Sequence, residues 1–110
     1  MSEQEPLGPM QGTLDLLILR TLALEPNHGW GIGQRIEQVS GVFRIKLGSL
    51  YPALQRLEKG GLVKASWKKS ENNRRARYYQ LTDEGQKRLE SEVSDWQRLA
   101  AGITRVLEAT

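Results

Sequence analysis

The stretch that decides the fold is residues 48–81, GSLYPALQRLEKGGLVKASWKKSENNRRARYYQL, in which a helical pattern gives way to two alternating ones. Leu50, Leu54 and Leu57 recur at i, i+4 and i+7, a spacing that places apolar side chains on one face of a helix. Ser49 is a suitable N-cap, because its hydroxyl can accept a backbone N–H of the first turn. These residues predict a helix that begins after Ser49 and ends at the Gly-Gly pair.

Two segments after this helix, residues 62–69 and 76–81, alternate between apolar and polar residues, as strands with one buried face do. The residues between them are rich in turn formers, so the two strands should form a hairpin with a basic tip. The side chains expected on its buried face are Val63, Ala65, Trp67, Tyr79 and Leu81.

The residues before the helix predict two further helices and a short strand. Thr13 is a candidate N-cap for a helix that runs to Glu25. This helix is apolar on nearly all sides, which indicates that more than one side is buried. A second, amphipathic helix should end near Gly41. The alternation in residues 42–46 predicts a brief strand.

A long helix is predicted from its N-cap, Thr82, to the C-terminus. Its apolar residues are spaced alternately by four and three, which is the heptad seam of a coiled coil. A chain of this size has no second domain for such a helix to pack against, so we expect a second copy of the chain as its partner. The seam consists of Leu89, Val93, Trp96, Ala100, Ile103 and Leu107.

Together these elements predict a mainly α-helical chain with a small β-hairpin, an α+β fold of the winged helix-turn-helix type. We divide the chain into a flexible N-terminal tail (residues 1–11), a winged helix-turn-helix domain (12–81) and a C-terminal dimerisation helix (82–110). A monomer of 110 residues buries a modest share of its surface, which also favours a homodimer.

Positive charge is concentrated in one part of the chain. Residues 44–79 contain ten Lys and Arg but two acids, a net charge of +8, whereas the remaining residues have a net charge of −5. This distribution is typical of a protein that binds a polyanion with one side; the alternative is a solvated basic face. Because the third helix of such a fold fits the major groove, double-stranded DNA is the expected partner.

The candidate DNA-binding residues lie on the outer face of the third helix and on the hairpin. Gln55 can read adenine, and Arg56 can read guanine or hold a phosphate. Ser49 and Tyr51 are better suited to phosphates. The alternative for Tyr51, Gln55 and Arg56 is that they are surface residues of a structural helix. Arg77, Lys68 and Lys69 could instead be solvated or paired with acids of the last helix, and Asn73 could only form a turn. The hairpin contributes Lys68, Lys69, Asn73, Arg74, Arg75 and Arg77.

Four segments of the chain, in this order, resemble the PadR family of bacterial transcriptional regulators: GTLDLLILRTLAL, HGWGI, GSLYPALQRLEKGGLV and RRARYYQLTDEGQKRL. The resemblance extends from about Gly12 to Leu89. It implies a dimeric winged-helix repressor of the short subgroup, which has one dimerisation helix. Trp30 departs from the family pattern, because a tyrosine is the commoner residue there.

The resemblance also concerns Trp96. In multidrug-sensing members of the short subgroup, a tryptophan of the last helix lines a hydrophobic chamber at the dimer interface, and Trp96 is similar in position. The alternative is that Trp96 only packs in the dimer seam. Candidate residues for the seam and for a pocket that holds a small hydrophobic or aromatic effector are Leu14, Leu17, Val93, Trp96, Ala100, Ile103 and Leu107, with Met10 as a further one.

Other classes of function find little support. The chain has no cysteine and one histidine, so we expect no metal site, and no motif suggests a cofactor or a catalytic nucleophile. We therefore expect that the protein is not an enzyme. No apolar run could span a membrane, and the first ten residues lack a signal-peptide pattern, so we expect a cytoplasmic protein.

The sequence thus predicts a sequence-specific DNA-binding regulator. In this interpretation it is a homodimeric repressor that binds a palindromic operator and is released by an apolar or aromatic effector. The alternative is a ligand-binding or protein-interaction module with incidental affinity for DNA.

Overall fold

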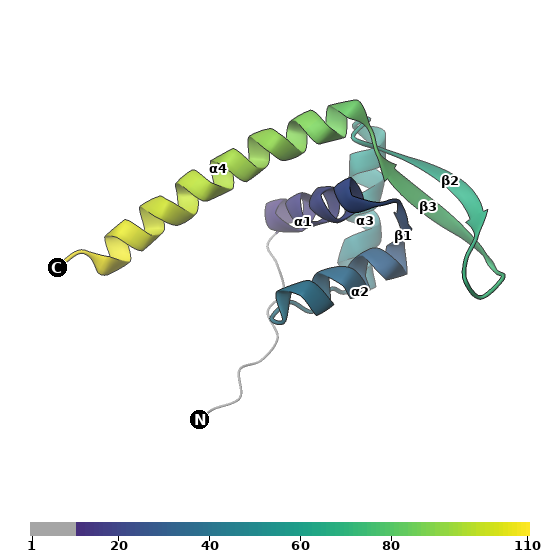
Figure 1. Ribbon diagram of the computed structural model, residues 1–110, viewed down its shortest axis with the longest axis horizontal. Coiled ribbons are helices and arrows are strands. Elements are labelled where there is room, and N and C mark those ends of the chain that lie inside the picture. The colour runs from purple at the N-terminus through teal and green to yellow at the C-terminus, as the bar shows by residue number, and fades with distance from the viewer. Residues whose placement is uncertain (1–10) are drawn as a thin grey trace, which may run out of the picture.

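The computed structural model describes residues 11–110, which form four helices and a three-stranded antiparallel sheet with strand order β1-β3-β2 (Figure 1). This arrangement confirms the predicted fold class. None of the helices in this range is both long enough and apolar enough to cross a membrane. The elements are α1 (Gln11–Leu24), β1 (Asn27–His28), α2 (Gly29–Ser40), α3 (Leu47–Lys59), β2 (Val63–Lys69), β3 (Arg75–Leu81) and α4 (Asp83–Glu108).

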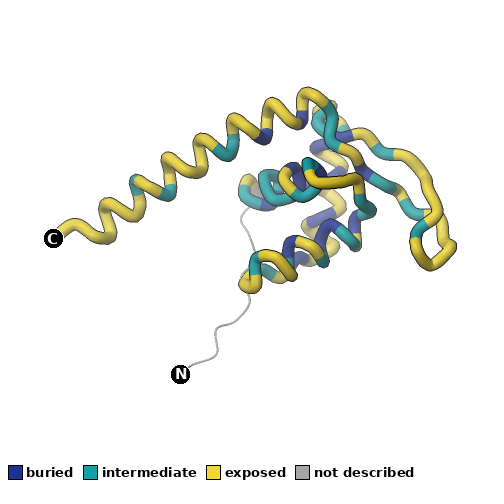
Figure 2. Tube along the Cα trace, in the orientation of Figure 1, coloured by how far each residue is buried: buried dark blue, intermediate teal, exposed yellow. Residues whose placement is uncertain are grey.

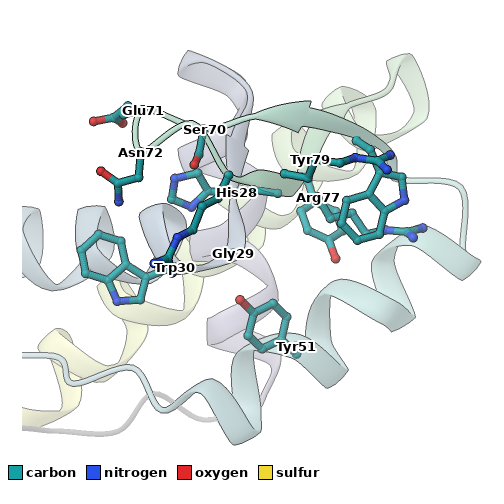
Figure 3. Close-up of a pocket in the computed structure, with 13 residues that line it drawn as sticks. His28, Gly29, Trp30, Tyr51, Ser70, Glu71, Asn72, Arg77 and Tyr79 are labelled. Atoms are coloured by element: carbon teal, nitrogen blue, oxygen red, sulfur yellow. The ribbon is translucent and has the colours of Figure 1, made fainter.

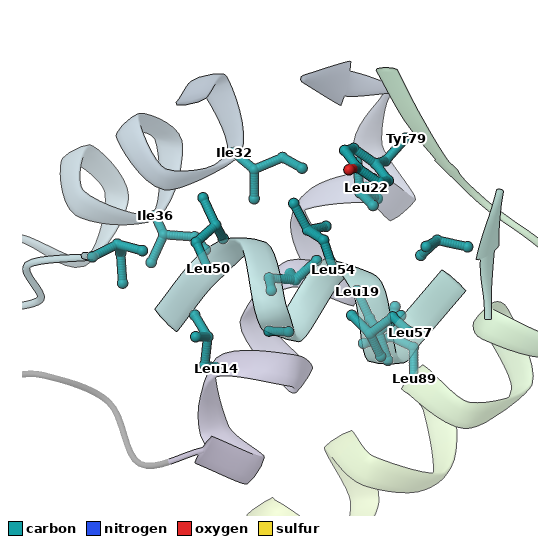
Figure 4. Close-up of a cluster of buried hydrophobic side chains, with 14 residues drawn as sticks. Leu14, Leu19, Leu22, Ile32, Ile36, Leu50, Leu54, Leu57, Tyr79 and Leu89 are labelled. Carbon is teal, nitrogen blue, oxygen red and sulfur yellow. The ribbon is translucent and has the colours of Figure 1, made fainter. Parts of the chain in front are cut away.

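One hydrophobic core, to which all four helices contribute side chains, holds these elements together (Figure 4). The α1 helix contacts α2, α3, α4 and β3, which explains why its sequence is apolar on nearly every side. Ile18 and Leu19 on α1 and Leu50 and Leu54 on α3 are completely buried. Leu14, a predicted pocket residue, also belongs to this core.

The starts of α1 and α3 differ from the prediction. The α1 helix already includes Gln11, so Thr13 lies inside the helix and is not its N-cap. Similarly, α3 begins at Leu47, and its N-cap is Lys46, whose carbonyl accepts the backbone N–H of both Ser49 and the next residue. Ser49 is therefore an exposed residue of the first turn. Residues 1–10, which include Met10 and nearly all of the predicted tail, lie outside the described residues.

The predicted strand at residues 42–46 is wrong, because only Phe43 pairs there, as a single bridge residue. Side chains of α2 satisfy backbone donors of this segment instead. The Glu37 carboxylate accepts the N–H of Ile45 at 2.7 Å, and the Ser40 hydroxyl accepts that of Phe43 at 3.0 Å. The third strand of the sheet is β1. It forms one edge of the sheet and pairs with β3, the middle strand.

Both ends of α2 have well-formed caps. The Nδ1 atom of His28 accepts the backbone N–H of Gly31 at 3.0 Å, so the imidazole is the N-cap. At the other end α2 stops before Gly41, as predicted, and Gly41 adopts the left-handed conformation (φ 70°) that terminates many helices. Because His28 also belongs to β1, its cap fixes the start of α2 beside the sheet.

Strands β2 and β3 form the predicted hairpin, which we call the wing, in a register from Val63 opposite Leu81 to Lys69 opposite Arg75. A tight turn closes its tip. Asn73 occupies the left-handed region in this turn, with φ 60°, a conformation that asparagine tolerates better than most residues.

The α4 helix starts at the predicted N-cap, Thr82, whose hydroxyl oxygen accepts the N–H of Gly85 at 3.0 Å. Its first half packs on α1 and buries Leu89. Its second half extends away from the domain, where most of its residues are exposed (Figure 2). Its length of 26 residues corresponds to about 39 Å.

Candidate nucleic-acid interface

The α3 helix has a polar outer face opposite its buried leucines. Tyr51 and Gln55 are exposed there, and the spacing of four residues places them next to each other on the helix surface. The outer end of the Tyr51 side chain is held in place, since Cε1 and the hydroxyl end of its ring pack on Gly29 of α2. A Cβ atom at Gly29 would lie 2.6 Å from Tyr51 Cε1, so this close approach requires glycine.

Two of the predicted DNA-binding arginines form ion pairs within the protein. Arg56 Nη2 lies 3.1 Å from Asp15 Oδ1 on α1, and Arg77 Nη2 lies 2.7 Å from Glu58 Oε2 on α3. The partner of Arg77 is thus an acid of α3 rather than of the last helix. Both pairs are partly exposed and hold their guanidinium groups against the protein surface.

The other wing cations have different surroundings. Lys68, Lys69, Arg74 and Arg75 are exposed, and none of them forms an ion pair with another residue in the range 11–110. Asn73, also exposed, serves the turn at the tip. The wing therefore presents an uncompensated positive surface that suits phosphates.

A groove of about 610 Å³ lies between the wing and the helices (Figure 3). The wing forms one wall, with Trp67, Arg75 and Arg77 among its side chains. The start of α2 and Tyr51 of α3 form the other wall. This groove thus connects the two surfaces that the sequence assigned separately to DNA.

Trp67 is 57% exposed, so the prediction that it is buried is wrong. It lies on the same strand as Val63, which is 2% exposed, but exposure increases along β2 toward the wing tip. Alternation predicts which side chains share a face but not how far the core extends beneath that face. The guanidinium carbons of Arg75 and Arg77 lie 5.3 and 5.9 Å from the centre of the indole.

Tyr79 lies at the inner end of the groove and is buried, as predicted. Burial raises the pKa of its hydroxyl above the ordinary value, and the positive charge of Arg77 partly opposes this effect. Tyr79 therefore remains a neutral phenol at physiological pH.

Two residues that the sequence did not assign to the interface, His28 and Trp30, also line this groove. Their rings are stacked with centroids 6.4 Å apart, and Trp30 is 58% exposed. Their position depends on the pairing of β1 with β3, which the sequence pattern did not predict. The only signal was their place in the HGWGI segment.

A second, almost entirely apolar groove of about 340 Å³ lies between α1 and α4. It brings together three of the predicted pocket residues, Leu17, Val93 and Trp96, with Leu16 and Phe43, which the sequence did not identify. Ala100 is half-buried farther along α4. Ile103 and Leu107 line a separate shallow groove near the end of that helix, together with Leu99, Gly102 and Val106.

Within residues 11–110, no three His, Asp or Glu side chains come close enough to form a metal site. The first groove offers cationic, amide and aromatic groups together with one carboxylate, that of Glu71, and the second groove offers mainly apolar groups.

Comparisons with known proteins agree with these features. A family model described as "Transcriptional regulator PadR-like family" matches residues 18–91. An uncharacterized protein, X, of Lysinibacillus sphaericus is 30% identical over 100 residues, which cover 90% of this chain and 92% of that protein.

Similar solved structures include smu.1704 from Streptococcus mutans UA159, with a TM-score of 0.84 and 29% identity over 94% of this chain and 93% of that one. A PadR family transcriptional regulator from Eggerthella lenta DSM 2243 has a TM-score of 0.79 and 31% identity, covering 91% of this chain and 86% of that one.

Proposed function

Because this chain belongs to the PadR-like family of transcriptional regulators, we propose that it is a cytoplasmic, homodimeric repressor that binds a palindromic operator. Membership makes it a DNA-binding regulator, and the family is one of regulators rather than enzymes. The observation that carries the finer proposal is the exposed face of α3 beside a basic wing, with one groove between them.

In this proposal α3 enters the major groove and the wing follows the phosphate backbone. Gln55 is the base-reading residue, since its carboxamide is exposed and can form paired hydrogen bonds with adenine. Arg56 positions α3 against α1 rather than reading a base, because Asp15 of α1 holds its guanidinium group. Arg74 and Arg75 bind phosphates, and Lys68, Lys69 and Ser49 add further backbone contacts.

The dimer forms through α4. Leu99, Ile103, Val106 and Leu107 are between 50% and 79% exposed in the single chain, which is an unusual accumulation of apolar surface on one helix. Pairing with the same helix of a second copy would cover it, with the heptad spacing that such contacts need.

The apolar groove between α1 and α4 supports a regulatory site for a small hydrophobic or aromatic effector. Trp96 is 50% exposed at this groove and offers a flat apolar surface for stacking. An effector that binds better to the DNA-free conformation would release the operator.

Replacing Arg74 and Arg75 together by alanine should weaken DNA binding about tenfold, for a duplex selected from a random library and for an unselected duplex alike. The slope of log K against log salt should decrease by about 3.6, because the homodimer loses two phosphate contacts in each subunit and each contact contributes about 0.9. Fluorescence anisotropy at several salt concentrations measures both effects.

The matched control is Gln55→Ala, which removes no charge. It should leave the salt slope unchanged and reduce the preference for the selected duplex. If the wild-type protein binds selected and unselected DNA equally well, the alternative of an interaction module with incidental DNA affinity is correct.

Titrating the protein with planar aromatic compounds should quench its tryptophan fluorescence saturably, and Trp96→Phe should abolish that quenching. Trp30→Phe, which changes an exposed indole outside the apolar groove, should leave it intact. Quenching that survives Trp96→Phe would contradict an effector site at this residue.

A further inference from the structure

A row of interacting side chains runs from the end of α3 along the wing wall of the groove. It starts at Glu58 on α3, whose carboxylate binds Arg77 at 2.7 Å. Arg77 lies opposite Trp67 in the strand register, with its guanidinium carbon 5.9 Å from the indole centre. The row ends at Arg75, whose guanidinium carbon lies 5.3 Å from the same ring.

The two arginines in this row differ in their charge balance. The charge of Arg77 is compensated by Glu58, whereas Arg75 forms no ion pair with any other residue in the range 11–110. Attraction between a guanidinium group and an indole face restricts the arginine side chain without neutralising its charge. Trp67 thus holds one cation that remains available to an anion.

The exposure of Trp67 indicates that its ring does more than pack in the hydrophobic core. Its indole is 57% exposed on the wall of the groove, opposite Tyr51 of α3. When a helix occupies the major groove and a wing follows the DNA backbone, one DNA strand lies between the helix and the wing. The phosphates of that DNA strand pass over the protein surface that joins the helix to the wing. In this protein that surface is the groove lined by Trp67, Arg75 and Tyr51.

We propose that Trp67 is a positioning residue that holds the Arg75 guanidinium in this groove for a phosphate of the DNA backbone. The Glu58–Arg77 ion pair holds the second guanidinium group that contacts the same indole. A guanidinium fixed by stacking can bind a phosphate with two hydrogen bonds and loses less conformational entropy than a free one. The inference rests on the proposed DNA-binding function.

A double-mutant cycle tests this coupling with a short duplex that the wild-type protein selects from a random library. Trp67→Leu should weaken binding about 5- to 30-fold, the range expected when the homodimer loses one exposed cation–π contact in each subunit. In the Arg75→Ala background the same change should alter affinity less than about twofold, because no guanidinium remains to be positioned.

Two conservative variants serve as controls. Trp67→Phe keeps an aromatic face and should stay within about threefold of wild type, whereas Arg75→Lys keeps the charge without the planar group and should lose affinity as Trp67→Leu does. Thermal unfolding should be similar for all variants, since both side chains are exposed. In a protein with Trp30→Phe and Trp96→Phe, bound DNA should protect the remaining indole from acrylamide quenching.

Equal losses from Trp67→Leu in the wild-type and Arg75→Ala backgrounds would overturn the proposal, as would an indole that acrylamide reaches equally with and without DNA. Either result would contradict only the role of Trp67 and not the proposed DNA-binding function, provided that the wild-type protein binds the duplex. If the wild-type protein binds neither the selected nor an unselected duplex at low salt, the proposed function itself fails.

Discussion

Replacing Leu107 by aspartate should prevent the proposed dimer from forming, leave a monomer, and lower the affinity for a palindromic duplex by about two to four orders of magnitude. Leu107 is 79% exposed in the single chain and lies on the apolar side of α4. A carboxylate there would have to be desolvated against the partner's apolar surface. The affinity falls because a monomer loses the gain that comes from binding two half-sites at once.

Ala101→Asp is the matched control, because it adds the same charge to the same helix on the opposite face, where residue 101 is exposed. This variant should remain a dimer. Light scattering after size-exclusion chromatography measures the mass of each variant, and DNA affinity is measured on the same samples. A dimeric Leu107→Asp protein together with a monomeric Ala101→Asp protein would place the interface on the other side of α4.

The local elements could be predicted because their signals are contained in short windows. Leu50, Leu54 and Leu57 define the buried face of α3, and Thr82 caps α4 as its position before two acids indicates. Tyr79 is buried as its place in β3 predicts. In each of these cases the deciding neighbours are a few residues away in the sequence.

The site residues were harder to predict because their partners are distant in sequence. Arg56 pairs with Asp15, 41 residues earlier, and Arg77 pairs with Glu58, 19 residues earlier. No local pattern shows which cations are compensated in this way. The environment of Trp67 is similarly non-local, because the wing continues past the edge of the core. Charge counting identified the basic region but not the cations within it that remain unpaired.

The junction between the wing and α4 depends on a glycine that no charge or periodicity argument identified. Gly85 lies in the first turn of α4 and is buried against Leu62. The Leu62 carbonyl accepts the backbone N–H of Thr82 at 3.1 Å, so it is fixed in place. A Cβ atom at Gly85 would overlap this carbonyl oxygen and would lie 2.7 Å from Leu81 Cδ1.

Gly85→Ala should therefore lower the free energy of unfolding by about 2 kcal/mol or more. Alanine favours the helix by about 1 kcal/mol relative to glycine, but overpacking against a fixed backbone carbonyl costs about 3 kcal/mol. At constant protein concentration, the melting temperature should fall by about 8 °C or more for a domain of this size. Thermal unfolding followed by circular dichroism measures this change.

Gly48→Ala is the control, since a Cβ at that position in α3 would meet no atom within 4 Å. Alanine at this position should leave the free energy of unfolding unchanged or raise it by up to about 1 kcal/mol, because the higher helix propensity of alanine is the only effect. The two substitutions are chemically identical, so their opposite signs would isolate the contact between α4 and Leu62. If Gly85→Ala instead stabilises the protein as Gly48→Ala does, the start of α4 does not pack against the wing in solution, and the direction in which α4 leaves the domain must differ.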